Sequence, residues 1–215
     1  MKILISSGHT LKGVGYGSTG YIIESEENRV LSNIVVKYLK YAGHEVDYHE
    51  VNEGSDYLEK QVAKANSKDY DLVVQIHFNA FKLTENAMGT ETYYLSESGK
   101  VWAEKINDKL STVFKSRGVK KGTGLYWLKN TKGISVLIEV CFVDSKHDTD
   151  TYKVNKEHIG KLIAEAINRK EISMPSEVFY RVVAGSYSNK ENAQKQIENL
   201  KKKGIDNAFI DIYKK

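Results

Sequence analysis

Cysteine and proline are almost absent from this sequence of 215 residues. The single cysteine, Cys141, excludes an internal disulfide and a cluster of thiolate metal ligands. It stands between Val140 and Phe142, so we expect it to pack as a small apolar side chain. The single proline, Pro175, marks a connector near the end of the chain.

Long hydrophobic runs are absent as well. No stretch reaches the about 20 apolar residues that a membrane-spanning helix needs. The apolar start at residues 1–5 is interrupted by Ser6 and Gly8 before the core of a signal peptide could form. We therefore expect cytoplasmic synthesis without a conventional export signal, and no membrane partner.

A strong excess of one charge is also missing. The 32 basic and 28 acidic residues leave a net charge of +4, which is too small to indicate binding to nucleic acid. The mild basic excess is compatible with an anionic polymer such as a bacterial cell wall. With 40% hydrophobic and 28% charged residues, the composition is that of a globular protein with one sizeable core.

Short apolar runs alternate with amphipathic patterns along the first 170 residues. We predict strands where β-branched residues form short runs, and helices where apolar residues recur every three or four positions. The resulting β-α-β-α-β order predicts an α/β fold, a mostly parallel twisted sheet with helices on both faces. The predicted strands are residues 2–9, 45–51, 71–77, 91–95 and 136–140, and the predicted helices are residues 28–41, 57–65, 101–114 and 155–168.

Two histidines and a glutamate stand out in these apolar runs. His9 and His77 each close a predicted strand, and Glu139 interrupts another. The carboxyl ends of parallel strands meet at one edge of a sheet, where two imidazoles and a carboxylate can hold Zn²⁺ and leave a position open for water. A metal-assisted hydrolase is therefore one interpretation, and structural, hydrogen-bonded histidines are the other.

A glycine-rich segment, residues 10–21, follows the first predicted strand. It lacks the Gly-Lys-Ser/Thr ending of a phosphate-binding loop and the spacing of a dinucleotide-binding turn, so we interpret it as a loop beside the site. The two tryptophans have different interpretations. Trp102 fits the apolar face of a predicted helix, whereas Trp127 could line a groove near the Glu139 strand.

A polar connector, residues 171–177, separates this part of the chain from a short tail. Residues 179–185, 189–203 and 208–213 predict a strand, a helix and a second strand. Below about 40 residues a single core rarely stabilises itself. The sequence therefore predicts a main domain at residues 1–170 and a dependent module at residues 178–215.

Four elements of the main domain resemble the zinc-dependent N-acetylmuramoyl-L-alanine amidases, particularly the short forms in endolysins of phages that infect clostridia. These enzymes have a Gly-His after the first strand, a Glu with an Asn four residues later, a His-x-Asn-Ala and an aliphatic run ending in Glu. The elements occur here as Gly8-His9, Glu24 with Asn28, His77-Phe78-Asn79-Ala80 and Val136-Leu137-Ile138-Glu139. Each element alone is common, and only their joint order is specific.

The resemblance implies that His9, Glu24 and His77 hold Zn²⁺ and that Glu139 is the catalytic carboxylate. The alternatives to Glu24 are the neighbouring acidic residues, since carboxylates are favourable at any helix N-terminus. The implied reaction is cleavage of the amide between N-acetylmuramic acid and L-alanine in bacterial peptidoglycan. The acidic alternatives are Glu26 and Glu27, and the candidates for substrate binding are Asn79, Thr90, Glu91 and Trp127.

The tail resembles half of a sporulation-related repeat, or SPOR domain, a module that binds glycan strands denuded of peptide. Because a SPOR domain has two β-α-β halves on one sheet and only one is present, we expect a homodimer in which two chains complete one sheet. Codons for residues 169–171 can resemble a ribosome-binding sequence, so a tail-only product starting at Met174 is a further hypothesis beside a chance methionine. The candidates for wall contact are Tyr180, Arg181 and Tyr187.

Two other functions stay open. A zinc carboxypeptidase acting on wall peptides needs a cation for the terminal carboxylate, and the sequence places no compelling arginine at the predicted strand ends. A non-catalytic wall-binding protein would have a closed zinc site with four protein ligands, so replacing Glu139 would weaken metal binding. The lack of an export signal favours a lysin that is released when the membrane is breached.

Overall fold

The computed structural model describes residues 1–173 and 183–212 of the chain. The chain divides into two units, residues 1–174 and residues 175–215. No helix in the described ranges is long and apolar enough to cross a membrane.

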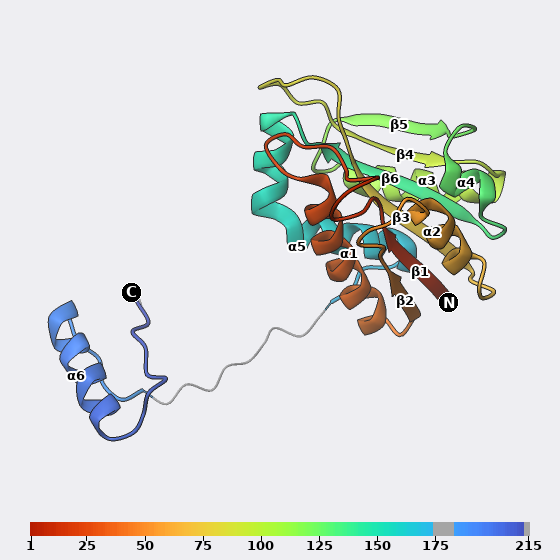
Figure 1. The fold of residues 1–215 in the computed structure, drawn as a ribbon. Helices are drawn as coiled ribbons and strands as arrows, with labels where there is room; N and C mark the ends of the chain where they lie inside the picture. The colour runs from red at the N-terminus through yellow and green to blue at the C-terminus, as the bar shows by residue number, and fades with distance from the viewer. Residues whose placement is uncertain (174–182, 213–215) are drawn as a thin grey trace. The chain divides into compact units, whose positions relative to one another are not determined.

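A six-stranded sheet runs through the first unit in the order β2-β1-β3-β6-β4-β5 (Figure 1). Neighbouring strands are parallel except at one place, where β4 runs antiparallel to β6. The predicted mostly parallel α/β sheet is therefore confirmed. The strands are β1 Lys2–Ser7, β2 Glu45–His49, β3 Leu72–Asn79, β4 Thr90–Tyr94, β5 Ser116–Lys121 and β6 Ser135–Phe142.

Helices cover both faces of this sheet, as predicted. On one face, helices α1 (Glu24–Tyr41), α3 (Glu97–Leu110) and α5 (Lys146–Asn168) form the larger apolar core with alternate strand residues. On the other face, α2 (Tyr57–Ala65) and α4 (Tyr126–Asn130) form a smaller core. Because strand side chains alternate between faces, each central strand contributes to both cores.

The smaller core leaves part of its sheet face to polar side chains. On β3, Val73 belongs to this core, and Gln75 and His77 follow at the two-residue spacing that keeps side chains on one face. On β6, Leu137 and Glu139 repeat the pattern. The polar residues therefore stand on the sheet face toward the carboxyl ends of β3 and β6. His77 does not close its strand as predicted, because β3 continues to Asn79. Glu139 interrupts the apolar pattern of β6 as predicted, and the strand continues to Phe142.

Two elements of the first unit were not predicted, and three helices, α1, α3 and α5, begin earlier than predicted. The edge strand β5 is polar and contains Gly118 at φ 77°, and α4 is a single short turn of helix. Helix α5 begins at Lys146, nine residues before the predicted start, because its first turns bury polar residues such as Asp148. Helix α1 begins at Glu24 with an acidic first turn, which apolar periodicity does not detect.

The second unit contains helix α6 (Lys190–Lys202), which matches the predicted helix at residues 189–203. The predicted strand at residues 208–213 is not formed over residues 208–212, and residues 183–185 are not a strand either. A strand needs a hydrogen-bonding neighbour, and the described residues of this unit offer none. The remaining residues of the two predicted strands, 179–182 and 213, lie outside the described ranges.

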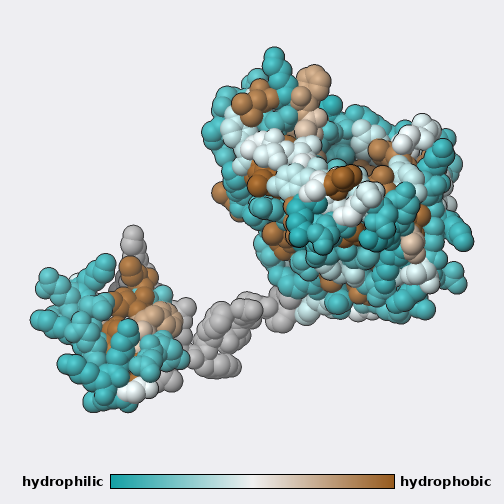
Figure 2. All heavy atoms as spheres, viewed as in Figure 1, coloured by the Kyte–Doolittle hydropathy of each residue, from teal (hydrophilic) through white to brown (hydrophobic). Residues whose placement is uncertain are grey.

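The second unit has no buried residue over the range 183–212. Figure 2 shows hydrophobic residues gathered on its surface beside hydrophilic ones. Such an arrangement is typical of a module that needs a partner to cover its apolar side chains. The large exposed hydrophobic residues are Val183, Tyr187, Ile205, Phe209, Ile210 and Ile212.

Candidate metal centre

His9, Glu24 and His77 meet above the carboxyl ends of β1 and β3. Glu24 Oε1 lies 3.2 Å from His9 Nε2 and 3.0 Å from His77 Nδ1. One ligand atom from each of the three residues lies within 4.8 Å of the other two. Tetrahedral zinc with bonds of about 2.1 Å keeps its ligand atoms about 3.4 Å apart, so the three side chains suit a single ion.

The backbone at His9 is held by a buried cation. His9 follows β1 by two residues and has φ 59°, a left-handed conformation that is uncommon outside glycine. The guanidinium of Arg29 donates hydrogen bonds to the carbonyls of His9 (3.1 Å), Ser25 (2.7 Å) and Val51 (2.9 Å). Asn28, four residues after Glu24, donates to the Gly8 carbonyl at 2.8 Å. These contacts fix the turn that presents the His9 ring.

Hydrogen bonding also determines which ring nitrogen of each histidine has a lone pair free to bind a metal. Nδ1 of His9 lies 2.9 Å from the Gly15 carbonyl. A carbonyl can only accept a hydrogen bond, so Nδ1 carries the proton and Nε2 keeps its lone pair toward Glu24.

For His77, two buried glutamine side chains determine which ring nitrogen carries the proton. Gln61 donates from Nε2 to the Ser7 carbonyl at 3.0 Å, so its Oε1 faces Gln75 and accepts from Gln75 Nε2 at 2.9 Å. Gln75 therefore presents Oε1 to His77 Nε2, at 3.1 Å. Because this oxygen accepts, Nε2 carries the proton of the His77 ring. Nδ1 is left with its lone pair toward Glu24.

Glu24 is the first residue of α1, and its carboxylate bends back toward the sheet. It accepts the Ser18 N–H at 2.8 Å and the Phe78 N–H at 3.1 Å. Burial alone would raise the pKa of Glu24, but its close contacts with His77 and His9 lower the pKa below its usual value. Of the two acidic alternatives, Glu27 contacts Lys156 at 2.9 Å, away from the histidines. Neither Glu26 nor Glu27 belongs to the cluster of ligand atoms.

The same environment shifts the pKa values of the two histidines in opposite directions. For His77, burial lowers the pKa more than contact with Glu24 raises it, so the ring is neutral, as a metal ligand must be. For His9, burial lowers the pKa as well, but close contact with the negatively charged Glu24 raises the pKa above its usual value.

Glu139 stands beside this cluster on β6. It lies next to His77 on β3 and opposite Glu91 on β4. Its Oε2 is buried and has no hydrogen bond to any part of the chain that the structure describes. Burial raises the pKa of Glu139 well above its usual value, and the charges of Glu24 and Glu91 add to the rise. A buried carboxylate oxygen without a donor is costly, so its position beside three ligand side chains fits a site for a metal and its water.

Two of the predicted substrate-binding residues line a groove next to Glu139. Asn79 and Glu91 belong to a cavity of about 360 Å³. Thr90 is fully buried and donates its hydroxyl to the Glu139 carbonyl at 3.1 Å, so it joins β4 to β6 and does not reach the groove. The same groove contains Arg117 and Lys120, which the sequence analysis missed because β5 was not predicted.

The prediction for Trp127 is wrong. Its side chain is 2% exposed, and its Nε1 donates to the Val136 carbonyl at 3.2 Å. It packs in the smaller core with Leu4 and Leu137. The cause is α4, a short helix that turns the Trp127 ring inward over the sheet. Cys141 is fully buried in the larger core, as predicted.

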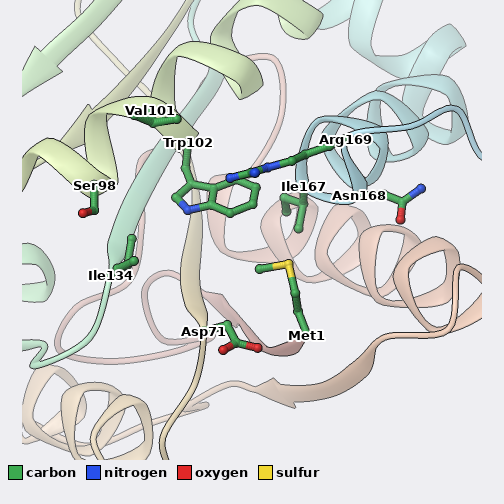
Figure 3. A pocket seen from close by; sticks show the side chains of 9 residues that line it. All are labelled: Met1, Asp71, Ser98, Val101, Trp102, Ile134, Ile167, Asn168 and Arg169. Carbon is green, nitrogen blue, oxygen red and sulfur yellow. The ribbon is translucent and has the colours of Figure 1, made fainter.

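A larger cavity, of about 550 Å³, lies at the opposite end of the sheet (Figure 3). It is lined by residues that precede β1, β3 and β6, including Met1, Asp71 and Ile134. There the guanidinium of Arg169 lies over the ring of Trp102, 4.2 Å from its centroid. Trp102 is 6% exposed and belongs to the larger core, as predicted. This cavity contains no cluster of metal-ligating side chains.

The sequence matches the N-acetylmuramoyl-L-alanine amidase family, Amidase_3, over residues 3–169. The chain belongs to this amidase family. A second match, to the SPOR domain, covers residues 165–211. The amidase match contains His9, Glu24, His77 and Glu139, and the SPOR match contains α6.

Solved structures share the fold of the amidase domain. The catalytic domain of the CD27L endolysin, described as targeting Clostridia difficile, is 35% identical with a TM-score of 0.74, over 80% of this chain and 99% of that chain. The catalytic domain of an N-acetylmuramoyl-L-alanine amidase from Bacillus (Paenibacillus) polymyxa var. colistinus is 22% identical with a TM-score of 0.69, over 79% of this chain and 97% of that chain, and shows the fold alone.

Curated relatives are longer proteins. An uncharacterised protein of Clostridium perfringens is 41% identical over 80% of this chain and 53% of its own length. The amidase LytC of Bacillus subtilis is 31% identical over 70% of this chain and 31% of its own length. The amidase-family chain therefore spans about half the length, or less, of these relatives.

Proposed function

We propose that this chain is a peptidoglycan hydrolase that cleaves the amide between N-acetylmuramic acid and L-alanine, with Zn²⁺ held by His9, Glu24 and His77. The observation that carries the proposal is the convergence of three candidate ligand atoms within 4.8 Å beside the buried Glu139 carboxylate, whose Oε2 has no hydrogen bond to the residues that the structure describes. The family match over residues 3–169 supports the substrate and the bond.

The chain's own residues have distinct tasks in this reaction. Bound zinc would lower the pKa of a water ligand toward about 7 and polarise the scissile carbonyl. Glu139 would take the proton of the attacking water and pass it to the nitrogen of L-alanine as the amide bond breaks. Its raised pKa suits both steps, because the carboxyl group must release the proton that it has taken. Asn79 and Glu91 would form one wall of the groove for the substrate.

The proposal is tested by digesting purified peptidoglycan with the wild-type protein and with Glu139→Gln. We expect wild type to release new N-terminal alanine without new reducing sugar. The variant should lose about 10³-fold or more in rate, in the range of general acid–base catalysis, and should keep one zinc per chain. Absence of new alanine termini would reject the amidase activity. Loss of zinc from Glu139→Gln would instead indicate a closed structural site that includes Glu139.

For the second unit we propose wall binding and a homodimer. The SPOR match supports binding to peptidoglycan, and the exposed apolar residues over the range 183–212 support a partner that covers them. A second copy of the tail would also provide the neighbouring strands that a β-α-β half lacks. Of the candidates for wall contact, Tyr187 is 46% exposed, and Tyr180 and Arg181 lie outside the described residues. A monomer at tens of micromolar in sedimentation equilibrium would reject the dimer.

A tail-only product that begins at Met174 remains part of this proposal. It would join the full-length chain through the same module. Intact-mass spectrometry of the protein expressed from its own gene tests it, and a spectrum without a species starting at Met174 or Pro175 would reject it.

One observation favours a second candidate, a zinc carboxypeptidase. Such an enzyme needs a cation near the metal, and the groove beside Glu139 contains Arg117 and Lys120. The same digest separates the two activities, because a carboxypeptidase would release the C-terminal residue of the wall peptide and no N-terminal alanine.

A further inference from the structure

Beside the candidate metal centre, strands β4 and β5 carry a charge cluster built around Glu91. The Glu91 carboxylate accepts hydrogen bonds on Oε1 from Asn79 Nδ2 at 3.0 Å and from the Tyr93 hydroxyl at 2.7 Å. On Oε2 it accepts from Arg117 Nε and Lys120 Nζ, both at 2.6 Å. Both oxygens of Glu91 are therefore fully used inside the cluster.

The cluster holds more positive charge than its own carboxylate requires. Two cations against one carboxylate leave a net charge of +1. Glu91 is 2% exposed, whereas the side chains of Arg117 and Lys120 are 33% and 40% exposed. The negative charge is thus at the bottom of the cluster and the positive charge faces solvent. One cation would be enough to neutralise Glu91, so the second is available to a ligand.

The N–H groups of Arg117 and Lys120 that do not bind Glu91 are held in fixed directions by neighbouring side chains. Arg117 donates a hydrogen bond from Nε to Glu91, whereas its Nη2 donates to no group within residues 1–173 and 183–212. Its guanidinium lies over the ring of Phe142, 4.9 Å from the centroid, which limits its rotation. Lys120 Nζ uses one contact on Glu91 and lies near the Tyr93 ring. A planar anion in the groove would meet N–H groups already held in place.

The cluster lies at a defined distance from Glu139. Glu91 is directly opposite Glu139, and Lys120 is paired with Tyr93 on the next strand. Neighbouring strands are about 4.8 Å apart, so the backbone of β5 lies about 10 Å from that of β6. The charged ends of Arg117 and Lys120 reach back to 2.6 Å from Glu91 Oε2, on the strand next to Glu139. An extended peptide advances about 3.4 Å per residue. L-alanine is the first residue after the scissile amide. The side chain of the residue that follows L-alanine is therefore within reach of the cluster.

We propose that Arg117 and Lys120 form a subsite for a carboxylate of the stem peptide, carried by the residue that follows L-alanine. The inference rests on the proposed amidase function and names a specificity determinant of the same site. The enzyme then discriminates between stem peptides in which this carboxylate is free and those in which it is an uncharged amide. A charged ligand group gives a stronger hydrogen bond to these cations than a neutral one does.

The test uses the full chain and a matched pair of soluble muramyl peptides that differ only in this carboxylate, free or amidated. For wild type we expect kcat/KM to be about 10-fold higher for the free acid, mainly through KM, as for a gained charge-assisted hydrogen bond. In Arg117→Gln and in Lys120→Gln the ratio should fall toward one. Each single variant leaves one cation on Glu91, so the buried carboxylate keeps a counter-ion.

A matched control and a binding measurement complete the design. Lys121→Gln removes the same charge from the next position of β5, whose side chain alternates to the other face, and should keep the wild-type ratio. Calorimetric Kd values for both peptides, measured with Glu139→Gln, should show the same preference without turnover.

The outcomes separate the two proposals. A wild-type ratio near one, or a ratio preserved in both Arg117→Gln and Lys120→Gln, overturns the subsite. Cleavage of both peptides without discrimination rejects only the subsite. No cleavage of either peptide rejects the amidase function, and the Kd comparison then still decides whether the carboxylate is bound.

Discussion

Glu139 separates two regions of the first unit that place their positive charge differently. On the β1–β3 side, the cation Arg29 is buried and gives its N–H groups to backbone carbonyls, so it leaves Glu24 to the histidines. On the β4–β5 side, Arg117 and Lys120 contact the Glu91 carboxylate directly and reach solvent. Arg29 also pairs with Glu50, 3.6 Å from Nε, so its charge is balanced away from Glu24. This difference fits the proposal that one side binds a cation and the other an anion.

Glu24→Gln is expected to have the largest effect on the proposed metal site. The amide is a poor metal ligand, so we expect zinc affinity to fall by more than the about 100-fold that the loss of an outer hydrogen-bonding partner costs. Competition with a chromophoric chelator measures it. Glu27→Gln, in the same first turn of α1 but bound to Lys156, is the control and should keep zinc. Equal zinc affinity in Glu24→Gln and wild type would remove Glu24 from the ligand set.

Gln75→Leu tests whether the buried amides set the nitrogen that His77 offers. Without the Gln75 acceptor, the His77 ring can carry its proton on Nδ1, so zinc affinity should fall by about 10–100-fold. The thermal unfolding of the metal-free variant is measured alongside. An affinity within twofold of wild type would show that Gln61 and Gln75 are only packing residues.

Glu139→Gln and Glu91→Gln should change the stability of the metal-free protein in opposite directions. The pKa of Glu139 is raised in the fold by burial, so its charge destabilises the folded state above about pH 4.3. For Glu91, burial raises the pKa but hydrogen bonds from Lys120, Tyr93 and Arg117 lower it below its usual value, so its stabilisation is present at pH 7 and lost as the pH falls below about 4.

At pH 7 we therefore expect Glu139→Gln to raise the free energy of unfolding, and Glu91→Gln to lower it, each by about 1 kcal/mol or more. Urea unfolding with chelator present measures both variants. Both differences should shrink on going from pH 7 to pH 4. A shift of the same sign in both variants would remove the contrast between the two carboxylates.

Truncation after residue 174 should have the smallest effect on the chemistry. The first unit holds both cores and all four candidate residues of the site, so hydrolysis of a soluble muramyl peptide should stay within about twofold of wild type. Co-sedimentation with peptidoglycan should fall in the same protein. A large loss of turnover on the soluble peptide would show that the tail contributes to the site.

The sequence was most informative where a polar, ionisable residue interrupted or followed a regular pattern of apolar residues. Strand β3 was predicted within two residues, and His77 marked it because a polar ring followed four apolar positions. Helix α2 was predicted with its observed bounds, Tyr57–Ala65. Glu24 came from resemblance and not from periodicity, because its helix starts with an acidic turn.

The missed parts of the site have a physical cause. Strand β5 is an edge strand with one polar face to solvent, so its residues show no apolar alternation, and Arg117 and Lys120 could not be placed beside Glu91. Trp127 was assigned to a groove from its position in the chain, but the turn of α4 decides its direction. The amide chain from Gln61 to His77 joins side chains from α2 and β3, and no spacing in the sequence reports such a contact.

Strand β6 is the last strand along the chain, yet it lies between β3 and β4 in the sheet. During synthesis, His9, Glu24 and His77 leave the ribosome long before Glu139 does. In the proposed enzyme, the candidate metal ligands are therefore synthesised before the candidate base, and hydrolysis would require the insertion of β6 between β3 and β4. Loss of that one central strand on unfolding would remove Glu139, and with it the proposed activity.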